Sequence, residues 1–256
     1  MRITSLVENT SAPGLPTEHG LSLFVEAGER RFLFDMGHTD LFARNARALG
    51  VDLNDAEFAV LSHGHYDHGG GMETFFALND HAPVYVSPHA FEPHYDGTEK
   101  DIGLDARMAD SPRIVPVNEV TGIAPGMTLY PADRNAVIAF DASGLTVLRD
   151  GAWVTEDFCH EQYLLVEEEG RRVLFSGCSH RGILNIMRRF QPDVLVGGFH
   201  LFKRPLDDDL AACADALDAF PTEYYTCHCT GTAQYEFLRG RMRRCNYLST
   251  GESIII

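Results

Sequence analysis

Two stretches of the chain repeat the same pattern of hydrophobic and polar positions. Residues 23–34 read LFVEAGERRFLF and residues 164–175 read LLVEEEGRRVLF, an ungapped match at an offset of 141 residues in which seven of twelve positions are identical. Each stretch has two alternating runs around a glycine-containing turn, a pattern typical of a β-hairpin. The repeat predicts that the two halves of the chain start from the same structural unit.

The elements that follow each hairpin correspond as well. Residues 41–49 and 183–190 suit amphipathic helices, and apolar runs at 58–61 and 194–197 suit short buried strands. The shared order favours an internal duplication over a chance match. We therefore expect a single domain over 1–256 built from halves of roughly 1–125 and 126–256. Its fold class is α/β, a four-layer αββα sandwich with strand ends of both halves along one edge.

A cluster of potential metal ligands follows the apolar run at 57–62. It reads His63-Gly64-His65-Tyr66-Asp67-His68, and three glycines lead from it into a helical pattern at 72–78. In an extended segment His63 and His65 project to the same side, so both can reach one ion, while Asp67 and His68 can reach a second. The alternative is a histidine-rich surface loop that binds nothing.

The motif His-x-His-x-Asp-His, after an apolar strand and before a glycine-led helix, resembles that of the metallo-β-lactamase-fold hydrolases, and nearly the whole chain fits the resemblance. Further motifs resemble a subgroup similar to the dihydropterin ribofuranosylaminobenzene 5'-phosphate synthase of methanopterin biosynthesis. They are Gly-Cys-Ser-His-Arg-Gly-Ile at 177–183, Gly-Gly-Phe-His-Leu at 197–201, Cys-His-Cys-Thr-Gly at 227–231, and the stretches 18–22 and 33–38.

Composition limits the classes of function. With 256 residues, 45% of them hydrophobic, the chain can bury a large core without disulfides, and its six cysteines lack the dense spacing of a secreted framework. No signal peptide or membrane span is evident, so we expect a cytoplasmic protein with no membrane partner. A net charge of −16 argues against binding nucleic acid.

Histidines that end strands in the second half are expected to complete the ligand set. His180 lies at a strand-to-helix junction and His228 ends the strand predicted at 224–228. We assign His63, His65 and His180 to a first ion, and Asp67, His68 and His228 to a second. A hydrogen-bonded core histidine is the alternative for both His180 and His228.

The remaining histidines have weaker claims. His200 also ends a strand at the predicted edge, and we expect it to face the substrate or support the ligands. His160, His89 and His94 are expected to line the cleft. Ordinary surface positions are expected for the rest, namely His38, His81 and His19.

The chain departs from the pattern that the resemblance implies. Many family members carry a third histidine ligand in a Gly-His-Thr/Ser-x-Gly turn and a bridging aspartate after a later strand. This chain has Asp-Phe-Cys-His-Glu-Gln at 157–162 and Gly-Cys-Ser-His at 177–180 instead. With no evident bridging aspartate, Asp67 would hold the second ion with His68 and His228 alone.

Two divalent ions would make a water molecule nucleophilic near neutral pH and polarise the oxygen under attack. Zn²⁺ is the first expectation, with Mn²⁺ or Fe²⁺ as alternatives. Among the catalytic residues, Asp67 would orient the water, and Asp35 would hold a ligand histidine or be a simple turn residue. His200 would stabilise negative charge or protonate a leaving group.

The polar stretch 89–115 is expected to be a lid or a solvated loop. As a lid, its Lys100, Arg107 and Arg113 would receive an anionic group, which favours a small anionic phosphoester or related ester, including one with a pterin-like group. An iron-dependent redox enzyme and a non-catalytic metal or metabolite sensor are the alternatives. Residues 253–256 suit a last strand and would also be compatible with a homodimer contact.

Overall fold

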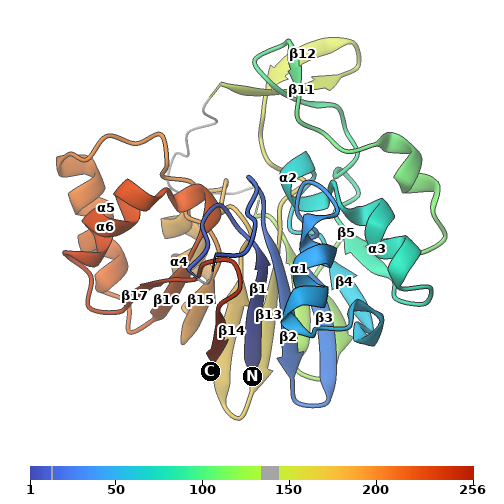
Figure 1. Cartoon of the computed structure of the whole chain (residues 1–256). Coiled ribbons are helices and arrows are strands. Elements are labelled where there is room, and N and C mark those ends of the chain that lie inside the picture. Colours follow the sequence, from blue (N-terminus) through green and yellow to red (C-terminus); the bar gives the residue numbers. More distant parts are fainter. Residues whose placement is uncertain (13, 134–143) are drawn as a thin grey trace.

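The computed structural model describes residues 1–12, 14–133 and 144–256 (Figure 1). Its first seven-stranded sheet has the order β18-β1-β2-β3-β4-β5-β8. The strands are β1 (Arg2–Val7), β2 (Ser22–Ala27), β3 (Arg30–Phe34), β4 (Phe58–Val60), β5 (Val84–Val86), β8 (Ile114–Pro116) and β18 (Ser253–Ile255). The predicted first hairpin is β2–β3, with Leu23 opposite Phe34. The predicted last strand is confirmed as β18, which pairs with β1.

The second sheet repeats this layout, in the order β17-β16-β15-β14-β13-β10-β9. Its strands are β9 (Thr121–Ala124), β10 (Met127–Pro131), β13 (Gln162–Glu168), β14 (Arg171–Phe175), β15 (Val194–Val196), β16 (Glu223–Thr226) and β17 (Cys245–Tyr247). The second predicted hairpin is β13–β14, with Leu164 opposite Phe175 in the register of the first copy. In both sheets the hairpin is followed by three parallel strands. The duplication remains a prediction. The predicted border between the two halves, near residue 125, does not coincide with the border between the two sheets, because β9 already belongs to the second sheet.

Helices cover the outer face of each sheet, which confirms the predicted αββα sandwich (Figure 1). Those of the first half are α1 (Leu41–Leu49) and α3 (Met72–Leu78), and those of the second are α4 (Ile183–Phe190), α5 (Asp208–Asp218) and α6 (Thr232–Arg239). Strand residues alternate between two cores: Phe32 and Phe34 pack between the sheets, while Leu33 packs under the helices. Because both faces are buried, these strands are almost continuously apolar.

A third, four-stranded sheet rises above the strand ends, at the top of Figure 1. It consists of β6 (His94–Asp96), β7 (Lys100–Asp101), β11 (Leu145–Arg149) and β12 (Ala152–Thr155). The stretch 89–115, expected to be a lid or a solvated loop, supplies two strands of this sheet, the short helix η2 (Ala106–Asp110) and β8 of the first sheet. Within the third sheet, β6 pairs with β11, which lies about fifty residues further along the chain. No pattern in the sequence indicates this pairing.

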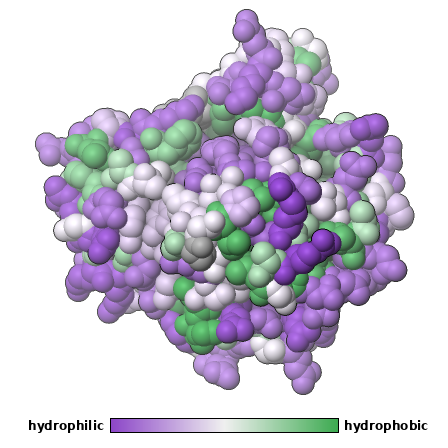
Figure 2. Space-filling model, in the orientation of Figure 1, coloured by the Kyte–Doolittle hydropathy of each residue, from purple (hydrophilic) through white to green (hydrophobic). Residues whose placement is uncertain are grey.

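The termini lie side by side, and the Met1 ammonium donates to the Ile256 carbonyl at 3.1 Å (Figure 1). Hydrophilic residues cover most of the face that Figure 2 shows, with hydrophobic residues in small groups between them. The homodimer remains a prediction. Within the described ranges, no helix is both long and apolar enough to cross a membrane.

Candidate metal centre

Strand ends of both sheets meet at one edge, as predicted. Asp35 follows β3, His63 follows β4, and His180 follows β14. His228 begins η3 (His228–Thr230), directly after β16 and Cys227. Parallel strands of one sheet end at the same edge, and the two sheets are packed face to face, so their carboxyl ends form one continuous rim.

The first predicted triad is assembled in the structure. One ring nitrogen from each of His63, His65 and His180 lies within 4.8 Å of the others. All three side chains are buried, and the Nε2 atom of each has no hydrogen-bond partner. Burial lowers the pKa of each of these histidines well below its ordinary value, which keeps the rings neutral at pH 7. Three neutral imidazoles with unsatisfied inward nitrogens fit a bound divalent cation.

The second predicted triad lies beside the first. His68 Nε2 is 3.2 Å from His228 Nε2, and Asp67 Oδ2 is 3.3 Å from His228 Nε2 and 3.9 Å from His68 Nε2. The rings of His63 and His68 have centroids 4.1 Å apart, so the two triads are adjacent.

The hydrogen-bond partners of Nδ1 in His68 and His228 determine whether each Nε2 carries a proton or a lone pair. His68 Nδ1–H donates to Asp35 Oδ2 at 2.7 Å, and His228 Nδ1–H donates to Asn9 Oδ1 at 2.8 Å. In the neutral rings both Nε2 atoms therefore carry lone pairs, and these face each other and a carboxylate. Such a group of acceptors is stable only around a cation or a proton.

Electrostatics points the same way. Burial raises the pKa of Asp67, but His68, His19 and His228 outweigh it and hold the pKa well below its usual range. Burial lowers the pKa of His68, but Asp35 and Asp67 outweigh it and raise the pKa above its ordinary value. For His228 burial dominates and lowers the pKa to about 4. The donor set, which includes one ionised carboxylate, attracts positive charge and fits a divalent cation.

Asp35 lies where the prediction placed it, beneath a histidine of the motif. Its carboxylate is buried and accepts from His68 Nδ1, from the Ser62 backbone N–H at 2.7 Å and from the Ser62 hydroxyl at 2.7 Å. These contacts orient the His68 ring.

Three residues of the site have a left-handed backbone, which non-glycine residues rarely adopt. The φ angles are 60° at Asp35, 51° at His200 and 49° at His228.

Cys178 is a candidate ligand that the sequence analysis did not identify. Its buried sulfur lies 3.1 Å from His68 Nε2, and it can share a metal ion with His63 and His68. The sulfur of Cys229 lies close by, 3.5 Å from the Cys178 carbonyl. The sequence did contain a signal, because Gly-Cys-Ser-His stands where the resemblance implies a different segment, and no bridging aspartate is evident. The structure places a thiol between the two triads at that position.

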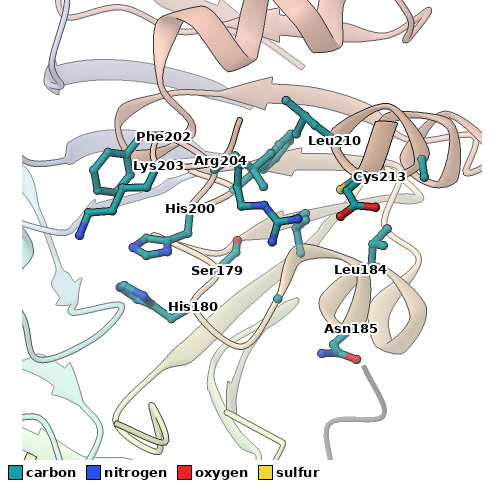
Figure 3. A pocket seen from close by; sticks show the side chains of 16 residues that line it. Ser179, His180, Leu184, Asn185, His200, Phe202, Lys203, Arg204, Leu210 and Cys213 are labelled. Atoms are coloured by element: carbon teal, nitrogen blue, oxygen red, sulfur yellow. The ribbon is translucent and has the colours of Figure 1, made fainter. Parts of the chain in front are cut away.

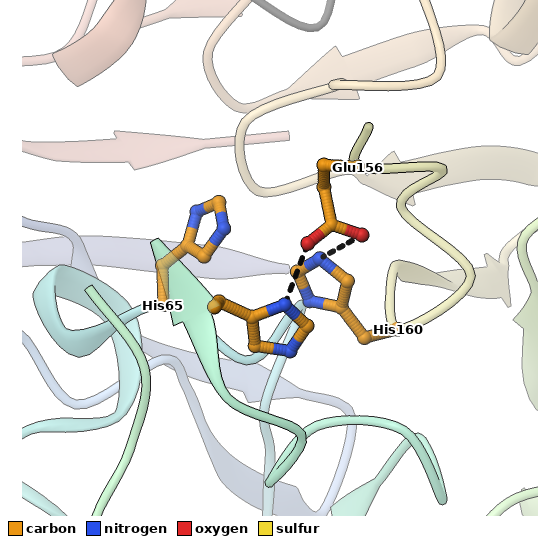
Figure 4. A group of neighbouring side chains, drawn as sticks. His65, Glu156 and His160 are labelled. Carbon is orange, nitrogen blue, oxygen red and sulfur yellow. Dashed lines mark hydrogen bonds and ion pairs between the residues drawn. The ribbon is translucent and has the colours of Figure 1, made fainter. Parts of the chain in front are cut away.

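A second group of potential ligands lies next to His65 and contains His94, Glu156 and His160 (Figure 4). His160 Nδ1 accepts from the Gly64 N–H at 2.8 Å, so its neutral ring carries the proton on Nε2, which faces Glu156. His94 uses both ring nitrogens, on Glu156 Oε2 at 2.6 Å and on the His89 carbonyl at 3.2 Å. Both rings thus have partners within the protein, whereas the inward Nε2 atoms of the first triad have none. The group contacts the loop that carries the histidine motif through the hydrogen bond from Gly64 to His160.

Two buried glutamates hold the backbone of the second-half histidines, and the sequence analysis missed both. Glu161 accepts from the His180 N–H at 2.7 Å and from the Arg181 N–H at 3.0 Å. Glu8 accepts from the His228 N–H at 3.0 Å and from the Tyr247 hydroxyl at 2.9 Å. Glu8 directly follows β1 at the strand-end edge, and that position was the only available signal.

The cleft over the second triad is lined by the ligand candidates and by residues of the third sheet and of the loop after β15. Besides the metal-ligand candidates it contains His19, Tyr66, Asp96, Lys100, Ile102, Leu145, His200, Phe202, Lys203 and Cys229. His200 is half-buried, and its ring lies 4.2 Å from that of His180, centroid to centroid. It therefore lies where a substrate-facing residue is expected, although its catalytic role stays a prediction.

Expectations for the other histidines were only partly right. His19 is exposed, as expected, but it is not without a role, because its Nε2 contacts Asp67 Oδ2 at 3.1 Å. His94 and His160 are buried behind the motif loop, and His89 lines a different pocket. His38 and His81 are exposed, as expected.

Two of the three cations proposed to receive an anion are engaged elsewhere. Arg107 pairs with Asp105 at the surface, and Arg113 donates to the carbonyls of Ala82 and Asn79. Lys100 does line the cleft. Main-chain acceptors cannot be recognised in a sequence, so the arginine contacts could not be anticipated.

Comparisons with known proteins agree with this geometry. The sequence pattern of the metallo-beta-lactamase superfamily matches residues 15–226. A crystal structure of a metal-dependent hydrolase of the beta-lactamase superfamily superposes with a TM-score of 0.86 at 31% identity, covering 100% of this chain and 99% of the other.

Two curated relatives come from Methanocaldococcus jannaschii. An uncharacterized protein is 26% identical over 243 residues, covering 90% of each chain. The 7,8-dihydropterin-6-methyl-4-(beta-D-ribofuranosyl)-aminobenzene-5'-phosphate synthase is 25% identical over 263 residues, covering 90% of this chain and 88% of the relative. The match extends over both halves and contains all but one of the predicted metal ligands, His228, and so the chain belongs to the metallo-beta-lactamase superfamily.

Proposed function

We propose that this protein is a dinuclear metallohydrolase that cleaves a small anionic phosphoester or a related ester. The observation that carries the proposal is the pair of adjacent buried triads, whose inward ring nitrogens either lack a partner or face one another. Such an arrangement is costly unless cations occupy it. We propose Zn²⁺ at both positions, because neutral imidazole and a thiol are donors that zinc accepts well.

Divalent ions bound at these residues would activate water at neutral pH and polarise the ester under attack. The protein's own residues would do the rest. Asp67, held by His19 at 3.1 Å, would accept a hydrogen bond from the attacking water and orient it. His200, at the wall of the cleft, would donate a proton to the departing oxygen.

The cleft supports an anionic substrate. Lys100 and Lys203 both line it, one from β7 and one from the loop after β15. Among the described residues no carboxylate lies within ion-pair distance of either ammonium. Two unpaired cations beside two metal ions would attract a phosphoryl group even on a protein with a net charge of −16.

The relatives' names leave hydrolysis as one of two candidate reactions. A similar solved structure is that of a metal-dependent hydrolase, whereas one relative is named a synthase. A synthase would pass the group to an acceptor other than water. The iron-dependent redox enzyme and the metal or metabolite sensor are further alternatives, and they differ from hydrolysis in metal identity and in turnover.

The first experiment is elemental analysis of protein purified without added metal, for the wild type and for His63→Ala and His180→Ala. We expect about two zinc ions per chain in the wild type and fewer in each variant. A panel of phosphate monoesters and diesters is then assayed in ¹⁸O-labelled water, with and without a chelator.

Label in the released phosphate, lost on chelation and restored by zinc, would support hydrolysis. Turnover only in the presence of a pterin-like or other acceptor, without label, would favour the synthase reaction. Iron with a visible absorption band would favour redox chemistry. A protein that binds no metal under metal-replete conditions would contradict the proposal.

A further inference from the structure

A second cavity, of about 390 Å³, lies beside the cleft, between α4, α5 and the loop after β15 (Figure 3). Four residues line both spaces, namely His180, His200, Phe202 and Lys203. In Figure 3, His180 and His200 stand at one end of the cavity and Leu184 at the other. A molecule whose reacting group lies at the metal centre can therefore extend past His200 into this cavity.

The walls of the cavity are apolar and fixed in place. Ile183, Phe199 and Leu210 are at most 4% exposed because they also belong to the core under α4 and α5. Phe202, 40% exposed, lines both the cavity and the cleft, and its ring centroid lies 5.5 Å from that of His200. The charged residues that line the cavity are Lys203, Arg204 and Asp209, so the formal net charge of the lining is +1 with the histidines neutral. A preformed apolar pocket of this size suits one or two aromatic rings.

We propose that this cavity is a specificity pocket that binds an apolar, aryl-sized group of the substrate whose anionic ester lies at the metal centre. The proposal rests on the proposed function, because it assigns the anionic group to the metals and to Lys100 and Lys203. It adds the chemical nature of the remaining part of the substrate. Leu184, half-exposed on α4 at the border of the core, is the side chain where a larger residue would fill the pocket.

The test compares the binding of phenylphosphonate and methylphosphonate to the zinc-loaded protein by calorimetry. Neither compound has an ester bond to cleave, and they differ only in the apolar group. We expect phenylphosphonate to bind about tenfold more tightly, as burial of a ring predicts. Leu184→Trp should remove this preference and leave the methylphosphonate affinity unchanged. Leu78→Trp, an exposed position on α3, is the matched control and should keep the preference.

The outcomes separate the two proposals. Equal binding of the two compounds by the wild type, or a preference that survives Leu184→Trp, would overturn the specificity pocket and leave the metallohydrolase intact. Failure of both compounds to bind the zinc-loaded protein would contradict the anion site, and the pocket proposal would fall with it.

An independent observation concerns Asn9, in the segment after β1. Its Oδ1 accepts from His228 Nδ1–H at 2.8 Å, and its Nδ2–H donates to His19 Nδ1 at 3.2 Å. The first contact places the lone pair of His228 on Nε2, toward the second triad. The second leaves the proton of a neutral His19 on Nε2, which donates to Asp67 Oδ2. One amide thus orients donors on both sides of the second metal position.

We infer that Asn9 is a positioning residue for the second ion. The test uses Asn9→Leu, which removes both contacts, and Asn9→Asp, which keeps an acceptor for His228 and loses the donor to His19. Zinc affinity is measured for each ion by competition with a chromophoric chelator. Nitrogen NMR of the metal-free protein reports the His228 tautomer and gives a readout that does not depend on metal loading.

We expect Asn9→Leu to weaken the second ion by about tenfold to a hundredfold and to spare the first. The His228 tautomer should become mixed in this variant. Asn9→Asp should retain the second ion and the Nδ1–H tautomer. Asn54→Leu, an exposed asparagine in η1 (Leu53–Asp55), is the control and should behave as wild type. Wild-type affinity and tautomer in Asn9→Leu, or equal losses in Asn9→Leu and Asn9→Asp, would overturn the inference.

Discussion

At the scale of single residues, the site depends on which atom each side chain presents to the centre. Asp35 and Asn9 occupy the outer nitrogens of His68 and His228, so both rings direct Nε2 inward. In His160, by contrast, Nδ1 accepts a hydrogen bond from the Gly64 N–H, so the ring proton is on Nε2 and no lone pair is left there for a metal ion. Hydrogen bonds outside the triads therefore decide which histidines can bind a metal ion.

The position of the Cys178 sulfur leads to a spectroscopic prediction. Cobalt-substituted wild-type protein should show a near-ultraviolet sulfur-to-cobalt charge-transfer band, because metal binding deprotonates a coordinating thiol. Cys178→Ser should lose this band, and its zinc affinity should fall by about tenfold or more. Cys213→Ser, outside the metal centre on α5, is the control and should retain both properties. A band that persists in Cys178→Ser would assign the sulfur ligand elsewhere.

The backbone at Gly64 has no room for a side chain. A Cβ at this position would lie 2.1 Å from the Ala90 carbonyl oxygen, so Gly64→Ala must displace His63 and His65. We expect a loss of about 1–3 kcal/mol in the free energy of unfolding of the metal-free protein and weaker binding of the first ion. Urea unfolding and zinc titration measure these effects. Gly122→Ala, where a Cβ would meet nothing within 4 Å, should leave both unchanged.

At the scale of elements, a small ionic group links segments that enter and leave the third sheet. Arg149 at the end of β11 contacts Glu92 Oε2 at 2.7 Å and both carboxylate oxygens of Asp157 at 2.9 and 3.0 Å. Burial raises the pKa of Asp157, but Arg149 outweighs it and holds the pKa below its usual range. These contacts join the hairpin β11–β12 to the segment before β6.

Arg149→Met should therefore destabilise the protein in a pH-dependent way. The pKa values of Asp157 and Glu92 are lowered in the folded state, so their contribution is present above the unfolded values, near 4, and is lost as the pH falls through the folded ones. We expect a loss of about 1 kcal/mol at pH 7, because the ion pairs are partly exposed, and convergence with the wild type in acid. Thermal unfolding at several pH values tests this.

The control for Arg149 is Arg107→Met, which removes a fully exposed pair with Asp105 and should change nothing measurable. A constant difference between Arg149→Met and the wild type from neutral pH into acid would contradict the ionic explanation. It would point to the packing of the arginine stem instead.

At the scale of the whole molecule, the metal centre depends on the packing of one sheet against the other. The ring of Phe175 contacts Phe32 at 5.8 Å and Phe34 at 5.4 Å, centroid to centroid, across the interface between the sheets. Each triad takes its members from both sheets, since His180 joins His63 and His65, and His228 joins Asp67 and His68. Sliding of the sheets would separate the ligands.

Phe175→Ala should consequently affect stability and metal binding together. We expect a loss of about 3–5 kcal/mol in the free energy of unfolding, from the cavity left between the sheets, and weaker binding of both ions. Phe237→Ala, a half-buried position on α6, should cost about 1 kcal/mol and leave metal binding unchanged. Denaturant unfolding and zinc titration report the two effects. Unaltered metal binding in a destabilised Phe175→Ala protein would argue against coupling through the interface.

The sequence by itself determined the elements that carry local signals and the order in which they occur. Both hairpins, the helices at 41–49, 72–78 and 183–190, and the strand-end positions of His63, His180 and His228 follow from periodicity, because alternation and glycine turns act over a few residues. The predicted fold places the strand ends of both sheets along one edge. Together with those positions, it was sufficient to predict that the members of the two triads come together.

Only the tertiary structure decided which other side chains reach the same centre. The contacts of Glu8 and Asn9 with His228 span about 220 residues, and Cys178 lies 110 residues from His68. The pairing of β6 with β11 spans about fifty residues, which is why the stretch that contains β6 and β7 was expected to be a lid or a solvated loop. The physical reason is that such contacts depend on how the two sheets and the N-terminal segment pack in space, and no local pattern of hydrophobic and polar residues encodes that packing.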